Sequence, residues 1–141
     1  MPEKLIIYTD GGARGNPGPA AAGGAIYARS GKLIEKFSKY LGERTNNEAE
    51  YEAIILALEK AARQRAAQVR FYMDSELVAR QLSGIYRVRE RRLAELLLKV
   101  RNLETNFQKV SFTHVPREKN RVADRLVNEC LDERVSRLRG K

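Results

Sequence analysis

The spacing of apolar residues in the first part of the chain predicts strands. Residues 4–10 are mostly β-branched or aromatic, which predicts a buried strand that ends at Asp10. The stretch that follows, at 11–19, is rich in Gly and Pro and predicts a turn or loop. Beyond it, two strand-like runs flank Ser30-Gly31, a pair typical of a hairpin. These two runs occupy 20–29 and 32–41.

Helical and strand periods alternate along the rest of the chain. Thr45-Asn46-Asn47 offers N-cap side chains at the start of a long helical pattern. Farther on, the apolar residues at 93, 96, 97, 100 and 103 have helical spacing. The predicted helices are 47–65, a short helix from Ser75 to near Gly84, 89–104 and 120–135, and the predicted strands are 69–73 and 110–115.

The resulting order of elements is β-β-β-α-β-α-α-β-α, which predicts an α/β fold. Three hairpin-joined strands followed by strand–helix units give a mixed five-stranded sheet with helices on its faces. A length of 141 residues suits one domain and leaves no room for a second. We expect this domain at 1–135, followed by a basic C-terminal tail at 136–141, a place where disorder is common.

Composition limits the cellular setting. No stretch approaches the ~18 uncharged apolar residues that would cross a bilayer, and the first residues lack the apolar core of a signal peptide. Cys130 is the single cysteine, which excludes an internal disulfide and a CxxC metal site. We therefore expect a cytoplasmic protein with no membrane partner.

Charge is distributed unevenly along the chain. The 27 Lys and Arg residues exceed the 18 Asp and Glu residues by nine, and this excess falls entirely within 61–141. Most of the basic residues are Arg, which binds phosphate in a bidentate fashion. The pattern favours a polyanionic partner, most simply a nucleic acid. A basic surface that serves solubility alone is the alternative.

Two acids stand where strands end. Asp10 and Asp74 each close an apolar run and begin the next element. Open α/β sheets place their sites at the carboxyl ends of strands, so the two carboxylates converge if their strands are neighbours. Helix capping is the alternative for Asp74, because Asp-Ser before a helix is common.

Helical geometry separates the acids of the predicted long helix. From Glu50, the positions four, seven, eight and eleven residues later are all apolar, so Glu50 is aimed at the sheet. The positions at the same spacing from Glu48 include Glu52 and Glu59, so this face of the helix is predicted to be largely solvated. We therefore take Glu50 as the candidate and interpret Glu48 as surface charge that benefits from the helix dipole.

A fourth acid borders the packed face of the last helix. Asp124 has Val127 and Leu131 three and seven residues later, and it lies near the start of that helix. Four converging carboxylates repel one another unless cations neutralise them. Oxygen ligands favour hard divalent ions, which points to Mg²⁺ or Mn²⁺ rather than zinc.

Four motifs together resemble the type 1 ribonuclease H family. They appear in the family's order and spacing over about 4–133, and the segment 115–120 looks like the family's short-loop branch. The family's pattern Asn-x-x-x-Glu falls on Glu50 and agrees with the helical argument. The motifs are Tyr8-Thr-Asp-Gly-Gly-Ala-Arg-Gly-Asn-Pro-Gly-Pro19, Thr45-Asn-Asn-Glu-Ala-Glu-Tyr51, Met73-Asp-Ser75 and Asn120-Arg-Val-Ala-Asp124.

The resemblance implies a sheet of order 3-2-1-4-5 with strand 2 antiparallel, and an endonuclease that cuts the RNA strand of an RNA–DNA hybrid. It implies two Mg²⁺ or Mn²⁺ ions, products with 5′-phosphate and 3′-hydroxyl ends, and a monomer without a protein partner. The family's acidic set falls on Asp10, Glu50, Asp74 and Asp124.

Substrate contacts are expected around the glycine-rich loop. Glycines let backbone amides approach a sugar edge and its 2′-hydroxyl. Arg44 and Thr45 resemble the family's pocket for a DNA phosphate, while Asn46 and Asn47 are alternatively simple helix caps. The full candidate set is Gly11, Gly12, Gly15, Asn16, Arg44, Thr45, Asn46, Asn47 and Gln81.

Two departures from the family pattern stand out. The segment 84–92 is too short for the basic protrusion of some relatives, although its four arginines supply part of that charge. Many relatives also carry a mobile histidine before the last acid. Here His114 belongs to the preceding strand as a packed or rim residue, and we expect Arg117 at the loop tip to contact the scissile phosphate.

Three rival functions differ in what the sequence should contain. A non-catalytic hybrid- or duplex-binding module of the same fold would show a substituted carboxylate, and all four are present. Integrases and junction resolvases of the same superfamily differ in the number and spacing of their acids. A ribonuclease H portion of a larger polymerase is the third, and we expect instead that the chain is its own domain.

Overall fold

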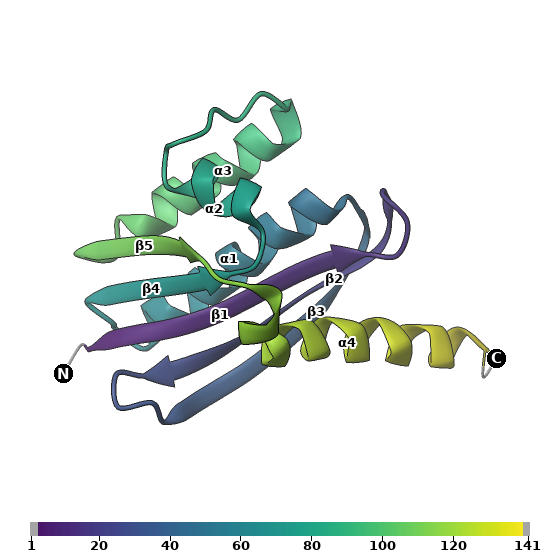
Figure 1. Ribbon diagram of the computed structural model, residues 1–141, viewed down its shortest axis with the longest axis horizontal. Coiled ribbons are helices and arrows are strands. Elements are labelled where there is room, and N and C mark those ends of the chain that lie inside the picture. The colour runs from purple at the N-terminus through teal and green to yellow at the C-terminus, as the bar shows by residue number, and fades with distance from the viewer. Residues whose placement is uncertain (1–2, 140–141) are drawn as a thin grey trace.

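The computed structural model describes residues 3–139, which form one sheet with helices packed on it (Figure 1). The order of elements is the predicted one, with a short 3₁₀ helix, η1 (Arg117–Lys119), added before the last helix. The strands are β1 (Lys4–Ala13), β2 (Gly18–Ala28), β3 (Leu33–Arg44), β4 (Gln68–Met73) and β5 (Lys109–His114), and the α-helices are α1 (Asn46–Arg63), α2 (Glu76–Leu82), α3 (Arg91–Glu104) and α4 (Arg121–Arg139).

The sheet has the order β3-β2-β1-β4-β5, which confirms the predicted topology. β2 runs antiparallel to β1 and β3, whereas β1, β4 and β5 are parallel. Tyr8 of β1 pairs with Tyr72 of β4, so Asp10 and Asp74, each two residues farther along the chain, lie next to each other on neighbouring parallel strands. The topology therefore brings these two acids together, as the sequence predicts.

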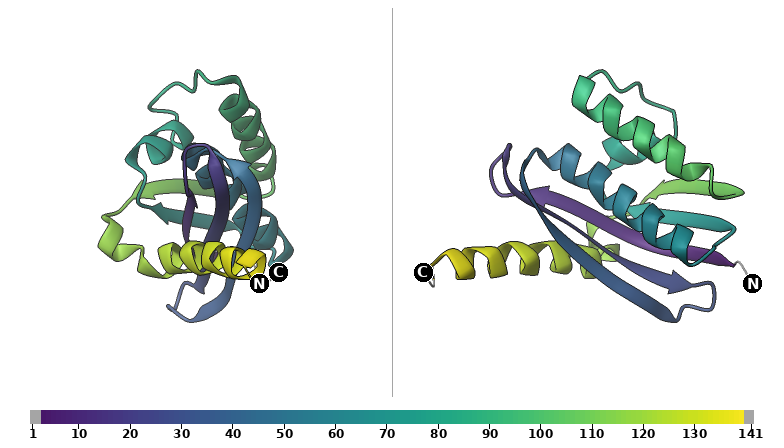
Figure 2. Two further views of the ribbon diagram at one scale, coloured as in Figure 1. Left: turned by 90° about the vertical axis from the view of Figure 1, so that its right-hand side faces the viewer. Right: turned by 180° about the vertical axis from the view of Figure 1, so that it is seen from behind.

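Helices cover the two faces of the sheet differently. α1 and α3 pack on one face, and α4 crosses the other face over β1, β2 and β3 (Figure 2). Because α4 lies at one end of that face, no helix covers the start of β1 and much of β4 and β5 on that side of the sheet (Figure 1).

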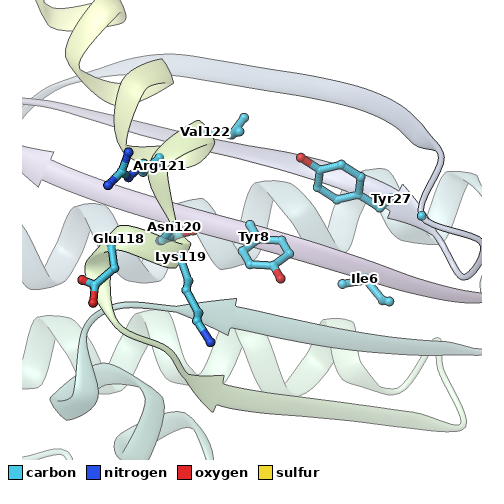
Figure 3. Close-up of a pocket in the computed structure, with 9 residues that line it drawn as sticks. Ile6, Tyr8, Tyr27, Glu118, Lys119, Asn120, Arg121 and Val122 are labelled. Atoms are coloured by element: carbon cyan, nitrogen blue, oxygen red, sulfur yellow. The ribbon is translucent and has the colours of Figure 1, made fainter.

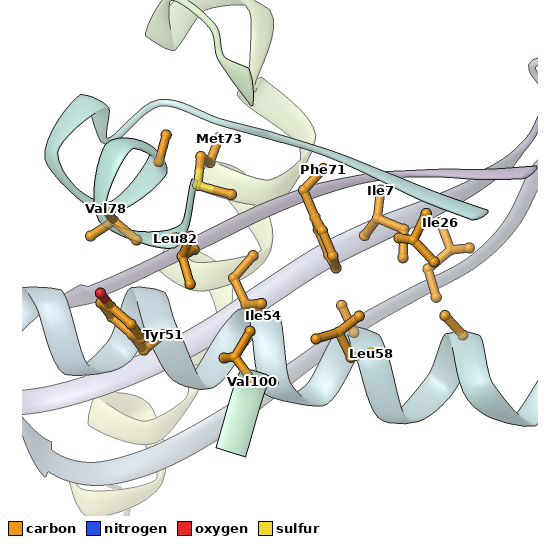
Figure 4. Packing of buried hydrophobic residues seen from close by; sticks show 14 of the residues in the cluster. Ile7, Ile26, Tyr51, Ile54, Leu58, Phe71, Met73, Val78, Leu82 and Val100 are labelled. Carbon is orange, nitrogen blue, oxygen red and sulfur yellow. The ribbon is translucent and has the colours of Figure 1, made fainter. Parts of the chain in front are cut away.

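Most of the buried apolar side chains lie between the sheet and α1. Ile7, Ile26 and Phe71 from three strands meet Leu58 of α1 and Val100 of α3 (Figure 4). Helix α1 presents buried alanines at every fourth position, which lets its backbone approach the sheet closely. These alanines are Ala49, Ala53, Ala57 and Ala61.

Two predicted boundaries were wrong. The predicted loop at 11–19 is mostly strand, because Gly11 and Gly12 pair with Ala22 and Ala21 and extend the hairpin. The loop itself is confined to 14–17. At the other end, residues 136–139 continue α4 rather than forming a separate tail, and 140–141 lie outside the described residues. An ion pair between Arg137 and Glu133, four residues apart, supports these last turns of α4, whereas Val135 and Leu138 are exposed.

None of the helices in residues 3–139 combines the length and apolar character needed to cross a membrane.

Candidate active site

Three acids from three elements meet at the end of β1. Asp10 lies in β1, Glu50 in the second turn of α1, and Asp74 directly after β4. One carboxylate oxygen from each lies within 4.8 Å of the others. The predicted convergence of these three side chains is thus present in the structure.

Gly11 explains how Glu50 comes so close to β1. Its backbone N–H donates a hydrogen bond of 2.7 Å to Oε1 of Glu50. A Cβ at position 11 would lie 2.3 Å from the carbonyl carbon of Ala49, a separation that packed atoms do not allow. Glycine at this position therefore permits α1 to dock where Glu50 can reach Asp10.

Burial and crowding raise the pKa of these acids. Burial, opposed by a hydrogen bond with Glu50 and reinforced by the negative charges of Asp74 and Asp124, raises the pKa of Asp10 to about 6. Glu50 has a pKa well above its ordinary value, first because it is buried and then because Asp10 lies beside it. The pKa of Asp74 is raised by burial, although the nearby Arg117 guanidinium opposes that shift. Without cations, these three acids therefore hold their protons to a higher pH than ordinary carboxyl groups do.

The cluster opens into a cavity of about 450 Å³. Asp124 of α4 lines this cavity but lies outside the group of three acids that meet within 4.8 Å. We call this cavity the acidic cleft. Its lining residues are Asp10, Gly11, Gly12, Ala13, Arg14, Asn46, Asn47, Glu50, Asp74, Ser75, Arg117, Asp124, Val127, Asn128 and Leu131.

Arg117 stands at the rim of the acidic cleft. Its guanidinium Nη2 lies 3.5 Å from Oδ1 of Asp124, and its side chain is 77% exposed. It is the first residue of the 3₁₀ helix η1, so the segment predicted as a loop forms a single helical turn here. His114, by contrast, is the exposed last residue of β5 beside Met73, which makes it a rim residue rather than a packed one.

The glycine-rich loop is tied to the start of α1. The side-chain oxygen of Asn46 accepts a hydrogen bond of 2.8 Å from the N–H of Ala13. In turn, the N–H of Asn46 donates to Oδ1 of Asn16 at 3.0 Å. Both asparagines therefore fix the loop geometry, and Gly15 makes the turn between Ala13 and Asn16 with a φ of 96°.

The cap of α1 differs from the expectation for Glu48. Thr45 is the N-cap, and its hydroxyl accepts from the N–H of Glu48 while Oε1 of Glu48 accepts from the N–H of Thr45. The other oxygen of Glu48 lies 3.4 Å from Nε of Arg92. Glu48 is thus a structural capping residue rather than plain surface charge.

Two candidate substrate contacts are already engaged within the protein. Nε of Arg44 donates to Glu52 at 2.7 Å, so a phosphate there would compete with a carboxylate. Gln81 is buried and does not line the acidic cleft, and its side-chain oxygen accepts a hydrogen bond of 2.9 Å from the Tyr51 hydroxyl. That burial removes Gln81 from the candidate set.

Asn128 and Arg14 also line the cleft, although the sequence did not single them out. Asn128 donates to the carbonyl oxygen of Asp124 at 3.0 Å, and its spacing of four residues on one helix could have revealed it. Arg14 forms an ion pair of 2.7 Å with Asp132, across the long separation between the loop and α4. No local pattern signals that second contact.

Comparisons with known proteins agree with this geometry. The reverse-transcriptase-like family matches residues 8–130. A ribonuclease HI of Halobacterium salinarum is 42% identical over 92% of this chain and 65% of its own length. A bifunctional protein of Mycobacterium tuberculosis is 38% identical over 92% of this chain, which spans 36% of that relative. The chain therefore spans less than two thirds of either curated relative.

Among solved structures, LC11-RNase H1 in complex with an RNA/DNA hybrid superposes with a TM-score of 0.88. It is 46% identical to this chain, and the match covers 93% of this chain and 99% of that one.

Proposed function

This chain belongs to the type 1 ribonuclease H family, and from that premise we propose that it hydrolyses the RNA strand of RNA–DNA hybrids. The observation that carries the proposal is the meeting of three carboxylate oxygens within 4.8 Å in an open cleft. The hybrid bound by LC11-RNase H1 supports the choice of substrate. We further infer that the chain acts as a monomer without a protein partner.

The acidic cleft fits divalent cations. Its donors at the centre are carboxylate oxygens alone, the ligand type that Mg²⁺ and Mn²⁺ prefer. Asp10, Glu50 and Asp74 would hold one ion between them, and Asp124 would complete the ligands of a second. Two bound cations would lower the pKa of an attacking water and stabilise charge on the leaving oxygen.

The protein's own groups position the substrate. Hydrolysis adds water to the phosphorus and breaks its bond to the 3′-oxygen, which leaves a 5′-phosphate and a 3′-hydroxyl. Asp10 and Glu50 are fixed by burial and by the Gly11 hydrogen bond, so they need little rearrangement before the reaction. Arg117 at the rim can donate to phosphate oxygens and offset the negative charge that builds on the scissile group.

Recognition of the RNA strand falls to the glycine-rich segment. Gly12 and Asn47 line the acidic cleft, where a sugar edge with its 2′-hydroxyl can approach the backbone. The Asn46–Ala13 and Asn16–Asn46 hydrogen bonds hold that segment rigid before substrate arrives. A DNA phosphate near Thr45 would find Arg44 once the ion pair with Glu52 opens.

A cleavage assay tests this function. The wild-type chain is incubated with a hybrid whose RNA strand is end-labelled and, separately, with the same RNA alone. Each reaction is run with Mg²⁺, with Mn²⁺ and with EDTA. We expect fragments from the hybrid only when a divalent ion is present, and each downstream fragment should carry a 5′-phosphate. Hybrid binding without cleavage in both metals would instead indicate a non-catalytic binding module.

A further inference from the structure

A second cavity, of about 420 Å³, opens on the uncovered part of the sheet (Figure 3). We call it the tyrosine cavity, after the two rings, Tyr8 and Tyr27, that line it. The activity proposed above makes no use of it. The remaining lining residues are Ile6 and Gly31 from the strands and their hairpin, and Glu118, Lys119, Asn120, Arg121 and Val122 from η1 and the start of α4.

Aromatic rings form one corner of this cavity. The rings of Tyr8 and Tyr27 stand edge to face, with centroids 5.9 Å apart and planes at 86°. On its other side Tyr8 stacks on Tyr72 of β4, at 5.1 Å. Three of the six tyrosines of the chain therefore gather at one place on the sheet. Such a cluster offers a flat ring both a face to stack on and an edge to contact.

The rim of the tyrosine cavity is mainly basic. Lys119 and Arg121 are exposed, and Glu118 is the one acid among the lining residues. Behind the rings, Arg70 of β4 donates from its guanidinium to the Tyr72 hydroxyl at 3.4 Å. Aromatic faces beside exposed cations complement a nucleic-acid strand, whose bases stack and whose phosphates are anionic.

Asn120 gives the wall of the tyrosine cavity a fixed geometry. It is 1% exposed, and its side-chain N–H donates to the carbonyl oxygen of Thr9 at 2.8 Å. Its side chain also hydrogen-bonds Asp74 and lowers the pKa of that carboxyl group. Asn120 therefore joins the wall of the tyrosine cavity to the acidic cleft.

We propose that the tyrosine cavity binds an unpaired base of single-stranded nucleic acid, with the neighbouring phosphate on Lys119 and Arg121. Stacking on Tyr8 and Tyr27 accepts any base, so the site reads strandedness rather than sequence. A base paired within a duplex has no free face to offer this corner.

The place of this cavity suggests which single strand it serves. Tyr8 and Asp10 lie on the same face of β1, two residues or about 7 Å apart. Arg117 lines the acidic cleft, while the next five residues line the tyrosine cavity. A strand that frays from, or extends beyond, a bound hybrid would therefore pass directly into it. This last step rests on the proposed function, whereas single-strand binding does not.

Fluorescence anisotropy of a labelled oligodeoxythymidylate tests the proposal, in EDTA so that no cleavage intervenes. Tyr27→Leu should weaken binding roughly 5- to 150-fold, the loss expected for one stacked base, and Tyr27→Phe should retain it because the ring stays. Lys119→Ala should lower the slope of log K against log salt by about 0.7, whereas Lys99→Ala, on the exposed surface of α3, should leave it unchanged.

The outcomes separate this inference from the proposed function. No binding of the oligonucleotide by the wild type, or equal affinity in the Tyr27→Leu and Lys119→Ala variants, would overturn the tyrosine cavity as a site. If Tyr27→Leu proves unfolded by thermal denaturation, the exposed Lys119 carries the test. Blunt hybrid should be cleaved by Lys119→Ala at the wild-type rate, so failure of cleavage in the wild type concerns the proposed function alone.

Discussion

Asp10 and Glu50 occupy positions that oppose their own ionisation. They are 8% and 7% exposed, and burial raises the pKa of both, with the charge of Asp10 raising that of Glu50 further. A folded protein tolerates such a pair at a cost in stability, which bound cations or protons relieve. At the scale of single residues, burial and repulsion strain the ionised carboxylates, and this strain favours the binding of positive charge.

That strain predicts how stability depends on pH in the metal-free protein. Because the folded pKa of Asp10 is about 6 and its ordinary value is 3.8, the folded state holds more protons between these values. The free energy of unfolding should thus lose a contribution as pH rises from about 4 to 7. In EDTA, Asp10→Asn should be more stable than wild type at pH 7.5 by about 1–3 kcal/mol, and this gap should shrink at pH 4. Urea unfolding at both pH values measures it, and a less stable Asp10→Asn protein at pH 7.5 would contradict the account.

Arg117 and His114 make a second pair at this scale. Arg117 lies 3.5 Å from Asp124 at the rim of the cleft, so Arg117→Ala should lower kcat roughly 10- to 1,000-fold. His114 is exposed at the end of β5, so His114→Ala should change both kcat and stability little. Steady-state cleavage of a hybrid at saturating metal compares them. A crippled His114→Ala enzyme beside an active Arg117→Ala enzyme would reverse the two roles.

At the scale of elements, the docking of α1 onto β1 depends on small residues at their interface. Alanines face the sheet along α1, and Gly11 leaves room for the backbone at Ala49 and Glu50. This close approach brings Glu50 into the cluster. The packing of α1 on β1 therefore determines the geometry of the site.

Adjacent glycines test that dependence. Gly11→Ala would place a Cβ 2.3 Å from backbone atoms of α1, which must shift, whereas a Cβ at Gly12 would meet Val127 at an ordinary 3.8 Å. We expect Gly11→Ala to lose about 1–3 kcal/mol of stability and most of its hybrid cleavage. Gly12→Ala is the matched control for stability alone, because Gly12 also lines the cleft, and it should lose less. Urea denaturation measures both variants, and equal losses of stability would argue against the interface.

Helices and strands could be predicted from the sequence where the apolar period and the capping residues agree. Prediction was less successful where contacts between residues distant in the sequence determine the structure. The helical period of α1 correctly predicted that Glu50 faces the sheet and Glu48 does not, because one regular helix determines the directions of both side chains. It could not show that Glu48 reaches Arg92, or that Gln81 is buried under Tyr51, since those contacts join separate helices. The sequence also did not show that β1 continues through Gly11 and Gly12. Glycine is typical of turns, but here it permits close packing.

At the scale of the whole molecule, a group of arginines lies outside the acidic cleft. The segment 84–92 runs from beyond the end of α2 into the start of α3 and carries arginines at 87, 89, 91 and 92, all exposed. Arg92 is already paired with Glu48 and Glu95. The other three are available to phosphates of a long duplex that extends beyond the cleft.

Removing these charges should affect affinity rather than chemistry. Replacing Arg87, Arg89 and Arg91 together by Ala should raise KM and leave kcat nearly unchanged. The slope of log K against log salt should become shallower by about 0.9 for each lost phosphate contact. Hybrid binding by the Asp74→Asn protein at several salt concentrations gives that slope. An unchanged slope would mean that these side chains face solvent in the complex.

The rate of hybrid cleavage by Glu50→Gln, set against Glu48→Gln, tests the central claim most directly. The two glutamates lie two positions apart on α1, and glutamine at 48 keeps the oxygen that accepts the Thr45 N–H bond. If the acidic cluster is the catalytic centre, Glu50→Gln should lose several orders of magnitude in rate at saturating Mg²⁺ or Mn²⁺, while Glu48→Gln should stay close to wild type. Near-normal cleavage by a folded Glu50→Gln protein would contradict the assignment of this cluster as the active site.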